Sequence, residues 1–159
     1  MRLIHFIICL LLLSKTSCMH SRGYEFHTKN NSDYHITKSS LYSRYNYPDT
    51  TIIFKPTGIM KPHSYSITPI SEPLEDIVKN TRKDTMSFFF FHADTLNKYT
   101  LEELQRGYMV LRRYDLSSQD IITLKNQYGV PEIHYPPDER MKDMKMWPPY
   151  GSECNIKKK

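Results

Sequence analysis

The clearest helical pattern in the chain lies in its second half. Apolar side chains recur there at spacings of three and four and would share one helical face: Leu101, Leu104, Tyr108 and Leu111. Thr100 precedes this run and Glu103 follows three residues later, the spacing of a capping box. The pattern therefore predicts a helix over 101–114.

A second helix is expected directly after the first. Ser117 or Ser118 can cap it, and Gly129 with Pro131 supplies the residues that commonly end a helix. With a short turn around Asp115, the two helices would form an αα-hairpin over about 101–128.

A shorter helix is predicted over about 73–82. Its apolar face would hold Leu74, Ile77 and Val78. The run Phe88–Phe91 that follows is a buried strand or an apolar plug of the core, because four exposed phenylalanines would favour aggregation. The predicted fold class is therefore small and mainly α.

Residues 19–72 lack sustained periodicity and are rich in Ser, Tyr and Pro. Such a segment buries little apolar area, so we expect a large irregular or disordered arm. Within it, Thr50–Phe54 is a possible short strand, and tyrosines such as Tyr24 and Tyr34 offer adhesive contacts.

The last thirty or so residues return to irregular chain. Met141, Met144, Met146 and Trp147 cluster there among prolines. Methionines suit an adaptable binding strip, but we expect this segment to fold back and extend the core.

The N-terminus has the pattern of a secretory signal peptide. Arg2 precedes an apolar run over 3–13, and small residues follow. This run is too short to cross a bilayer, which requires about 20 residues. Cleavage after Cys18 or after Gly23 fits the pattern; an uncleaved anchor or a buried first helix are the alternatives.

These features divide the chain into four parts. They are a signal peptide (1–18), a disordered Tyr/Ser/Pro-rich arm (19–72), a small helical domain (73–150) whose C-terminal part is Pro-rich, and a basic tail (151–159).

Charge argues against a nucleic-acid partner. The chain has 22 Lys and Arg against 17 Asp and Glu, a formal net charge of +5. Arg2 and Lys15 lie in the expected leader and Lys157–Lys159 end the chain, so the body between them is neutral. A nucleic-acid-binding protein usually concentrates basic residues on one face. No segment after the leader is apolar enough to span a membrane.

Two residues are candidates for covalent modification. Asn30 begins an Asn-Asn-Ser tripeptide, an acceptor for N-glycosylation. Cys154 is the single cysteine left if cleavage follows Cys18, so it is a candidate for an intermolecular disulfide and a homodimer. Cleavage upstream of Cys18 would allow a Cys18–Cys154 pair instead, and an unpaired thiol without a role is the third possibility.

The sequence offers little catalytic or metal-binding chemistry. The pairs His92 with Asp94 and Glu132 with His134 stand two apart, which is typical of surface residues rather than of a metal site. A calcium-binding loop from Asp115 fails because Asn126 stands where a glutamate is required. Nucleophile motifs and glycine-rich phosphate loops are missing, so we expect neither an enzyme nor a cofactor.

The predicted function is therefore that of a small secreted, non-enzymatic protein that binds another protein. One alternative is a peptide-hormone precursor cut at the dibasic pairs Arg82-Lys83 and Arg112-Arg113. Another is an extended structural component of a ciliary or organellar assembly.

Overall fold

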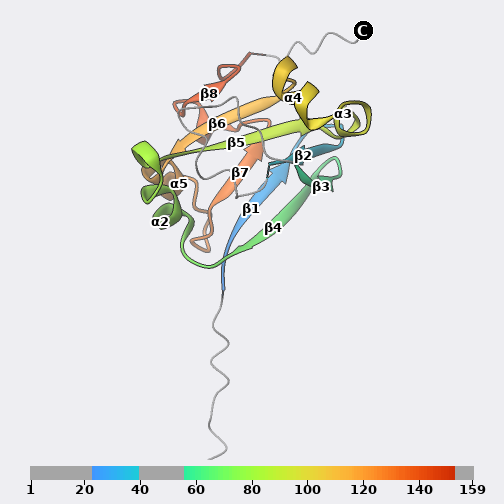
Figure 1. The fold of residues 1–159 in the computed structure, drawn as a ribbon. Helices are drawn as coiled ribbons and strands as arrows, with labels where there is room; N and C mark the ends of the chain where they lie inside the picture. Colours follow the sequence, from blue (N-terminus) through green and yellow to red (C-terminus); the bar gives the residue numbers. More distant parts are fainter. Residues whose placement is uncertain (1–22, 40–55, 153–159) are drawn as a thin grey trace, which may run out of the picture.

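The computed structural model of the chain describes residues 23–39 and 56–152. Strands outweigh helices in it, 37% against 27%, and they form one sheet of three strands and one of five (Figure 1). The predicted mainly α fold with a helical hairpin is therefore wrong, because the protein is mainly β.

Four strands come first along the chain, and helices are interspersed with the remaining strands after them. The strands are β1 (Tyr24–Asn30), β2 (Ile36–Lys38), β3 (Thr57–Met60), β4 (Ser64–Ile70), β5 (Thr85–His92), β6 (Arg112–Ser117), β7 (Glu132–Tyr135) and β8 (Met146–Trp147). The helices are α2 (Leu74–Lys79), α3 (Ala93–Lys98), α4 (Leu101–Gly107) and α5 (Ser118–Thr123), with 3₁₀ turns η2 (Arg82–Asp84) and η3 (Glu139–Met141).

The smaller sheet has the order β4-β1-β7. Strand β1 pairs antiparallel with β4 along its whole length, from Tyr24 opposite Ile70 to Asn30 opposite Ser64. On its other side β1 pairs parallel with β7. The segment expected to be a disordered arm thus contributes four strands, β1 to β4, in its described part. Thr50–Phe54 lies outside the described residues, as do the leader over 1–18 and the tail over 153–159.

The larger sheet has the order β3-β2-β5-β6-β8, and all its pairs are antiparallel. Its central strand β5 holds the run Phe88–Phe91, which is confirmed as a buried strand. Phe88 and Phe90 pack into the main core, while Phe89 and Phe91 join Val110 on the opposite face. A strand covered on both faces explains why hydrophobic residues run consecutively along it.

The predicted helix over 101–114 is right at its beginning and wrong at its end. Thr100 and Glu103 form the expected capping box, with the Thr100 backbone N–H donating to Glu103 Oε2 at 2.7 Å. The helix stops at Gly107 because Tyr108 adopts a left-handed conformation (φ 45°). The chain then enters β6, which satisfies the backbone groups of the buried β5.

The second helix also begins where predicted. Ser117 caps α5 through a reciprocal hydrogen-bonded pair with Asp120. The helix ends at Thr123, however, so Gly129 (φ 76°) serves a later turn that leads into β7 rather than the helix end.

The third predicted helix is present as α2. Leu74, Ile77 and Val78 are buried on one face, as expected. Figure 1 shows α2 and α5 together at one end of the molecule, where they pack against each other.

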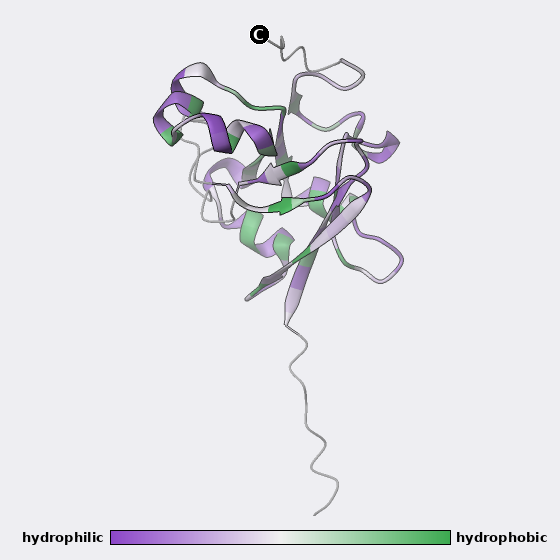
Figure 2. Cartoon of the chain, turned by 90° about the vertical axis from the view of Figure 1, so that its right-hand side faces the viewer, coloured by the Kyte–Doolittle hydropathy of each residue, from purple (hydrophilic) through white to green (hydrophobic). Residues whose placement is uncertain are grey.

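The C-terminal segment folds back on the core, as predicted. Met141 and Met144 are buried in the main hydrophobic cluster, and β8 adds to the edge of the larger sheet. Figure 2 shows hydrophilic residues over much of the ribbon and hydrophobic ones gathered in short stretches. Across residues 23–39 and 56–152, no helix has the length and apolar character needed to cross a bilayer.

Candidate functional site

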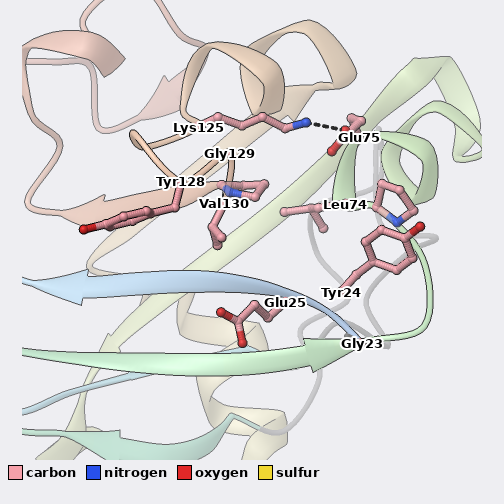
Figure 3. Close-up of a pocket in the computed structure, with 11 residues that line it drawn as sticks. Gly23, Tyr24, Glu25, Leu74, Glu75, Lys125, Tyr128, Gly129 and Val130 are labelled. Atoms are coloured by element: carbon pink, nitrogen blue, oxygen red, sulfur yellow. Dashed lines mark hydrogen bonds and ion pairs between the residues drawn. The ribbon is translucent and has the colours of Figure 1, made fainter. Parts of the chain in front are cut away.

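An open hollow of about 680 Å³ lies at the end of the smaller sheet where β1 begins (Figure 3). Its walls come from three segments that are distant in sequence: residues 23–25, residues 73–75 at the start of α2, and residues 125 and 128–131 between α5 and β7. The fold thus brings the beginning of the described chain against its second half.

Two tyrosines dominate the rim of this hollow. Tyr128 is 80% exposed and Tyr24 is 51% exposed. Figure 3 shows their rings on opposite sides, with Val130 and Leu74 between them in this view. Pro73 and Pro131 complete the apolar lining. Exposed aromatic rings around a depression are typical of a binding surface rather than of a packed core.

Local hydrogen bonds hold Tyr128 outward. Asn126 Oδ1 accepts from the backbone N–H of Tyr128 at 2.9 Å and from that of Val130 at 3.2 Å. Gly129 lies between them with a positive φ of 76°, a conformation that glycine adopts without strain. This side-chain-stabilised turn fixes the direction in which the Tyr128 ring projects.

Two carboxylates and one lysine line the hollow: Glu25, Glu75 and Lys125. Lys125 Nζ donates to Glu75 Oε1 at 2.5 Å, so these two neutralise each other. Partial burial raises the pKa of Glu75, but the hydrogen bond and charge of Lys125 outweigh this and hold it below its usual value. Glu25 also lines the hollow, and its side chain is 41% exposed. Its carboxylate lies 3.1 Å from His27 Nε2 on the outer face of the sheet, so Glu25 is an acidic group beside the hollow rather than inside it.

The outer face of the same sheet carries further ionisable groups. His27 Nε2 lies 3.1 Å from Glu25 Oε1, and its ring is 6.1 Å from that of Tyr65 on β4. His27 is paired with Glu132 and Lys29 with His134 across the parallel β1–β7 ladder. A mixed row of charged and aromatic side chains thus crosses the sheet.

His134 lies between two carboxylates. Its Nε2 is 2.5 Å from Glu132 Oε1 and its Nδ1 is 2.8 Å from Asp138 Oδ2. Arg140 binds the same Asp138 oxygen at 2.8 Å. Partial burial raises the pKa of Glu132, but the His134 hydrogen bond and charge, together with Arg140, outweigh this and lower it. Both ring nitrogens are engaged, which leaves none for a metal, and no group of three metal ligands occurs in the described ranges.

The other predicted pair, His92 with Asp94, has a local role. His92 precedes α3, and its Nδ1 accepts from the backbone N–H of Asp94 at 3.3 Å. The His92 ring also stacks on Tyr34 with a centroid distance of 5.2 Å. These contacts stabilise the end of β5 and the start of the helix.

Asn30 is buried, with 0% of its surface exposed. Its Nδ2 donates to the backbone oxygens of Tyr34 and Lys61, both at 2.9 Å. Ser32 of the same tripeptide donates to Asn30 Oδ1 at 2.6 Å. The structure thus gives this predicted glycosylation site a full set of internal partners.

The two dibasic pairs lie in contrasting places. Arg82 and Lys83 are exposed in η2, where Lys83 has a φ of 61°. Arg112 is only 6% exposed, and its guanidinium donates to the backbone oxygens of Pro149 and Ser152. Arg113 continues β6 and donates to the Tyr108 hydroxyl at 2.6 Å. Cys154 lies outside the described residues.

No family model, curated protein or solved structure matches this chain. The hollow must therefore be interpreted from its own residues. The sequence does not predict it, because its pattern places Tyr24 in an irregular arm and Tyr128 in a helix. Gly129 and Pro131, two residues that commonly occur in turns, are the available clue to an exposed loop there.

Proposed function

We propose that this chain is a small secreted, non-enzymatic protein that binds another protein. Its hollow takes an extended, proline-containing segment that carries a basic side chain. The observation that carries this proposal is the pair of exposed tyrosines, Tyr24 and Tyr128, on opposite sides of a proline-lined depression.

Proline-rich segments fit this surface for a physical reason. Tyrosine rings give flat apolar contacts for proline rings and keep a hydroxyl available for hydrogen bonding. A polyproline II segment is already extended when free, so it loses less conformational entropy on binding than an ordinary loop does. The hollow is open to solvent rather than enclosed, which suits a passing chain better than a buried small molecule.

The acidic group beside the hollow also favours a ligand with a basic side chain. Lys125 is occupied by Glu75, whereas Glu25, next to His27, is an acidic group beside the hollow without a lysine or arginine partner among the ion pairs of the described residues. A lysine or arginine of the partner segment can pair with Glu25 and can also lie over a tyrosine ring. An acidic segment would meet repulsion at the same place.

Fluorescence anisotropy with a labelled peptide tests the proposal. The probe is a proline-rich peptide with one arginine, compared with a twin in which glutamate replaces that arginine. We expect saturable binding of the first and at least about tenfold weaker binding of the second, which corresponds to about 1.4 kcal/mol.

Variants locate the binding. Tyr128→Ala and Tyr24→Ala should each weaken binding of the arginine peptide by about tenfold or more, as expected for aromatic residues at the centre of an interface. Tyr99→Ala removes a tyrosine that is 42% exposed and lies outside the hollow, so it is the matched control. Equal losses in all three variants, or no binding at all, would contradict the proposal.

A further inference from the structure

Strand β4 has one edge that is not paired with another strand. It is the outer strand in the order β4-β1-β7, and across residues 23–39 and 56–152 no strand pairs with its outer side. Figure 1 shows β4 at the outside of the molecule, with β1 on its inner side.

The hydrogen-bond pattern identifies which backbone groups face outward. The backbone N–H of His27 donates to Pro131 O at 2.8 Å and that of Asn31 to Tyr135 O at 2.7 Å, so alternate residues of β1 are turned toward β7. The residues between them face β4, and their partners there include Thr68 and Ser66. The remaining residues of β4, Tyr65, Ile67 and Pro69, therefore direct their backbone groups to the open edge.

The same residues present their side chains to solvent. Tyr65 is 67% exposed and Ile67 is 49% exposed on the outer face of the sheet. Proteins usually protect an edge strand with lysine, proline or a bulge. Pro69 protects one end of β4, because it has no N–H, but the Tyr65–Ile67 stretch has no such protection.

We infer that β4 pairs antiparallel with β4 of a second copy of this chain, which joins two three-stranded sheets into one continuous sheet. The register follows from Pro69. If Tyr65 pairs with Ile67 of the second copy, both residues have an N–H and can exchange backbone hydrogen bonds. A register centred on Ile67 would instead place Tyr65 opposite Pro69, which has no N–H to donate, and hydrogen bonds between the strands would be lost. The two-fold axis then passes beside Ser66.

Charge favours a second copy as the partner. Lys29 and Lys61 are exposed toward one end of β4, and Glu25 and Glu72 are at least partly exposed toward the other. Asp33 at the basic end lies 3.0 Å from His63, and Glu25 at the acidic end lies 3.1 Å from His27, so a histidine stands beside one carboxylate at each end. Antiparallel pairing places the basic end of each copy beside the acidic end of the other, so the strand is complementary to itself.

The contact should be weak and reversible. A single pair of strands contributes less than the roughly 1,000 Å² expected of a stable interface. We therefore expect a monomer–dimer equilibrium that depends on concentration. A dimer held by Cys154 would instead disappear on reduction, so the two forms can be distinguished.

Sedimentation velocity in the presence of a reducing agent tests the inference. The wild-type chain should shift from monomer to dimer as its concentration rises. Ile67→Lys should keep it monomeric, because a lysine on an edge strand opposes pairing. Ile122→Lys is the matched control, since Ile122 is 46% exposed on α5, and it should dimerise like the wild type.

A cysteine substitution tests the register. In a chain whose three natural cysteines are replaced by serine, Ser66→Cys should form a covalent dimer on mild oxidation, because the two copies of residue 66 lie opposite each other in a non-hydrogen-bonded pair. Ser64→Cys, one pair further along, should not. Circular dichroism confirms that each variant is folded.

Two results would overturn the inference. A wild-type chain that stays monomeric at every concentration excludes self-pairing and leaves the edge to an extended segment of another protein. A dimer that persists in Ile67→Lys places the interface elsewhere. Neither result depends on peptide binding at Tyr24 and Tyr128.

Discussion

The Ser32 hydroxyl donates a hydrogen bond of 2.6 Å to the side-chain oxygen of Asn30, and both residues are buried. The Asn30 amide nitrogen in turn donates to the backbone oxygens of Tyr34 and Lys61. This one side chain therefore ties the end of β1 to the turn that follows β3, where the chain passes between the two sheets.

Asn30→Ala should destabilise the fold strongly. It removes the Nδ2 donor for the Tyr34 and Lys61 oxygens and the Oδ1 acceptor for the Ser32 hydroxyl and backbone N–H, and each buried unsatisfied group costs about 1–3 kcal/mol. We expect a loss of at least about 2 kcal/mol in the free energy of unfolding, measured by urea denaturation. Asn31→Ala, at the exposed neighbouring position, should change it by less than about 0.5 kcal/mol. Equal effects would contradict the assigned role.

The folded protein should carry no glycan at Asn30, although the tripeptide is a glycosylation acceptor. A sugar on Nδ2 would displace the hydrogen bonds to Tyr34 and Lys61 and has no room at a position with 0% exposure. The measurement is intact mass before and after peptide N-glycosidase treatment of the denatured protein expressed in secretory cells. A mass loss with conversion of Asn30 to aspartate would show that the prediction is wrong.

Trypsin should cut the two dibasic pairs of the native protein at different rates. Arg82 and Lys83 are exposed in a short turn with a positive φ at Lys83, whereas Arg112 is buried in β6. Proteases bind extended, accessible chain, so the first cut should follow Arg82 or Lys83. In urea both pairs should be cut at similar rates. Early cleavage after Arg112 or Arg113 under native conditions would contradict the placement of β6 and would favour the hormone-precursor alternative.

Lys38 should make stability depend on pH in the alkaline range. Its ammonium lies 4.8 Å from the centre of the Phe26 ring and donates to the Thr28 and Thr68 hydroxyls, and burial lowers its pKa from 10.5 to about 8. Between these values the unfolded chain binds the proton more tightly, so stability should rise with pH. Above about pH 10 the buried Tyr114, whose pKa burial raises, opposes this trend.

Urea denaturation between pH 7 and 9.5 tests this slope. Lys38→Met should abolish the part of the rise that begins near pH 8, because it removes the titrating group. Lys79→Met changes an exposed lysine and should leave the slope unchanged. A slope that is the same in wild type and Lys38→Met would show that Lys38 does not titrate in this range.

Local signals in the sequence were reliable where neighbouring residues determine the structure. The capping box at Thr100, the cap at Ser117, the apolar face of α2 and the buried strand of phenylalanines are all present. Each depends on contacts within a few residues or on a run too apolar to be exposed. The positions where α2, α4 and α5 begin could therefore be predicted.

The positions where helices end could not be predicted, because distant strands decide them. The helical spacing from Leu101 to Leu111 continues past Tyr108, yet β5 needs a neighbour for its backbone groups, and Arg112–Ser117 supplies it. In the same way β1 has few aliphatic residues, but pairing with both β4 and β7 orders it. The hollow depends on these long-range pairings, which a single sequence does not reveal.

The most direct test of the central claim is an NMR titration of the ¹⁵N-labelled protein with the proline–arginine peptide. We predict saturable shifts at the amides of 23–25, 74–75 and 125–130, which line the hollow, and none around α4. Shifts that are spread over the surface, or that centre on another element, would contradict the hollow as the binding site.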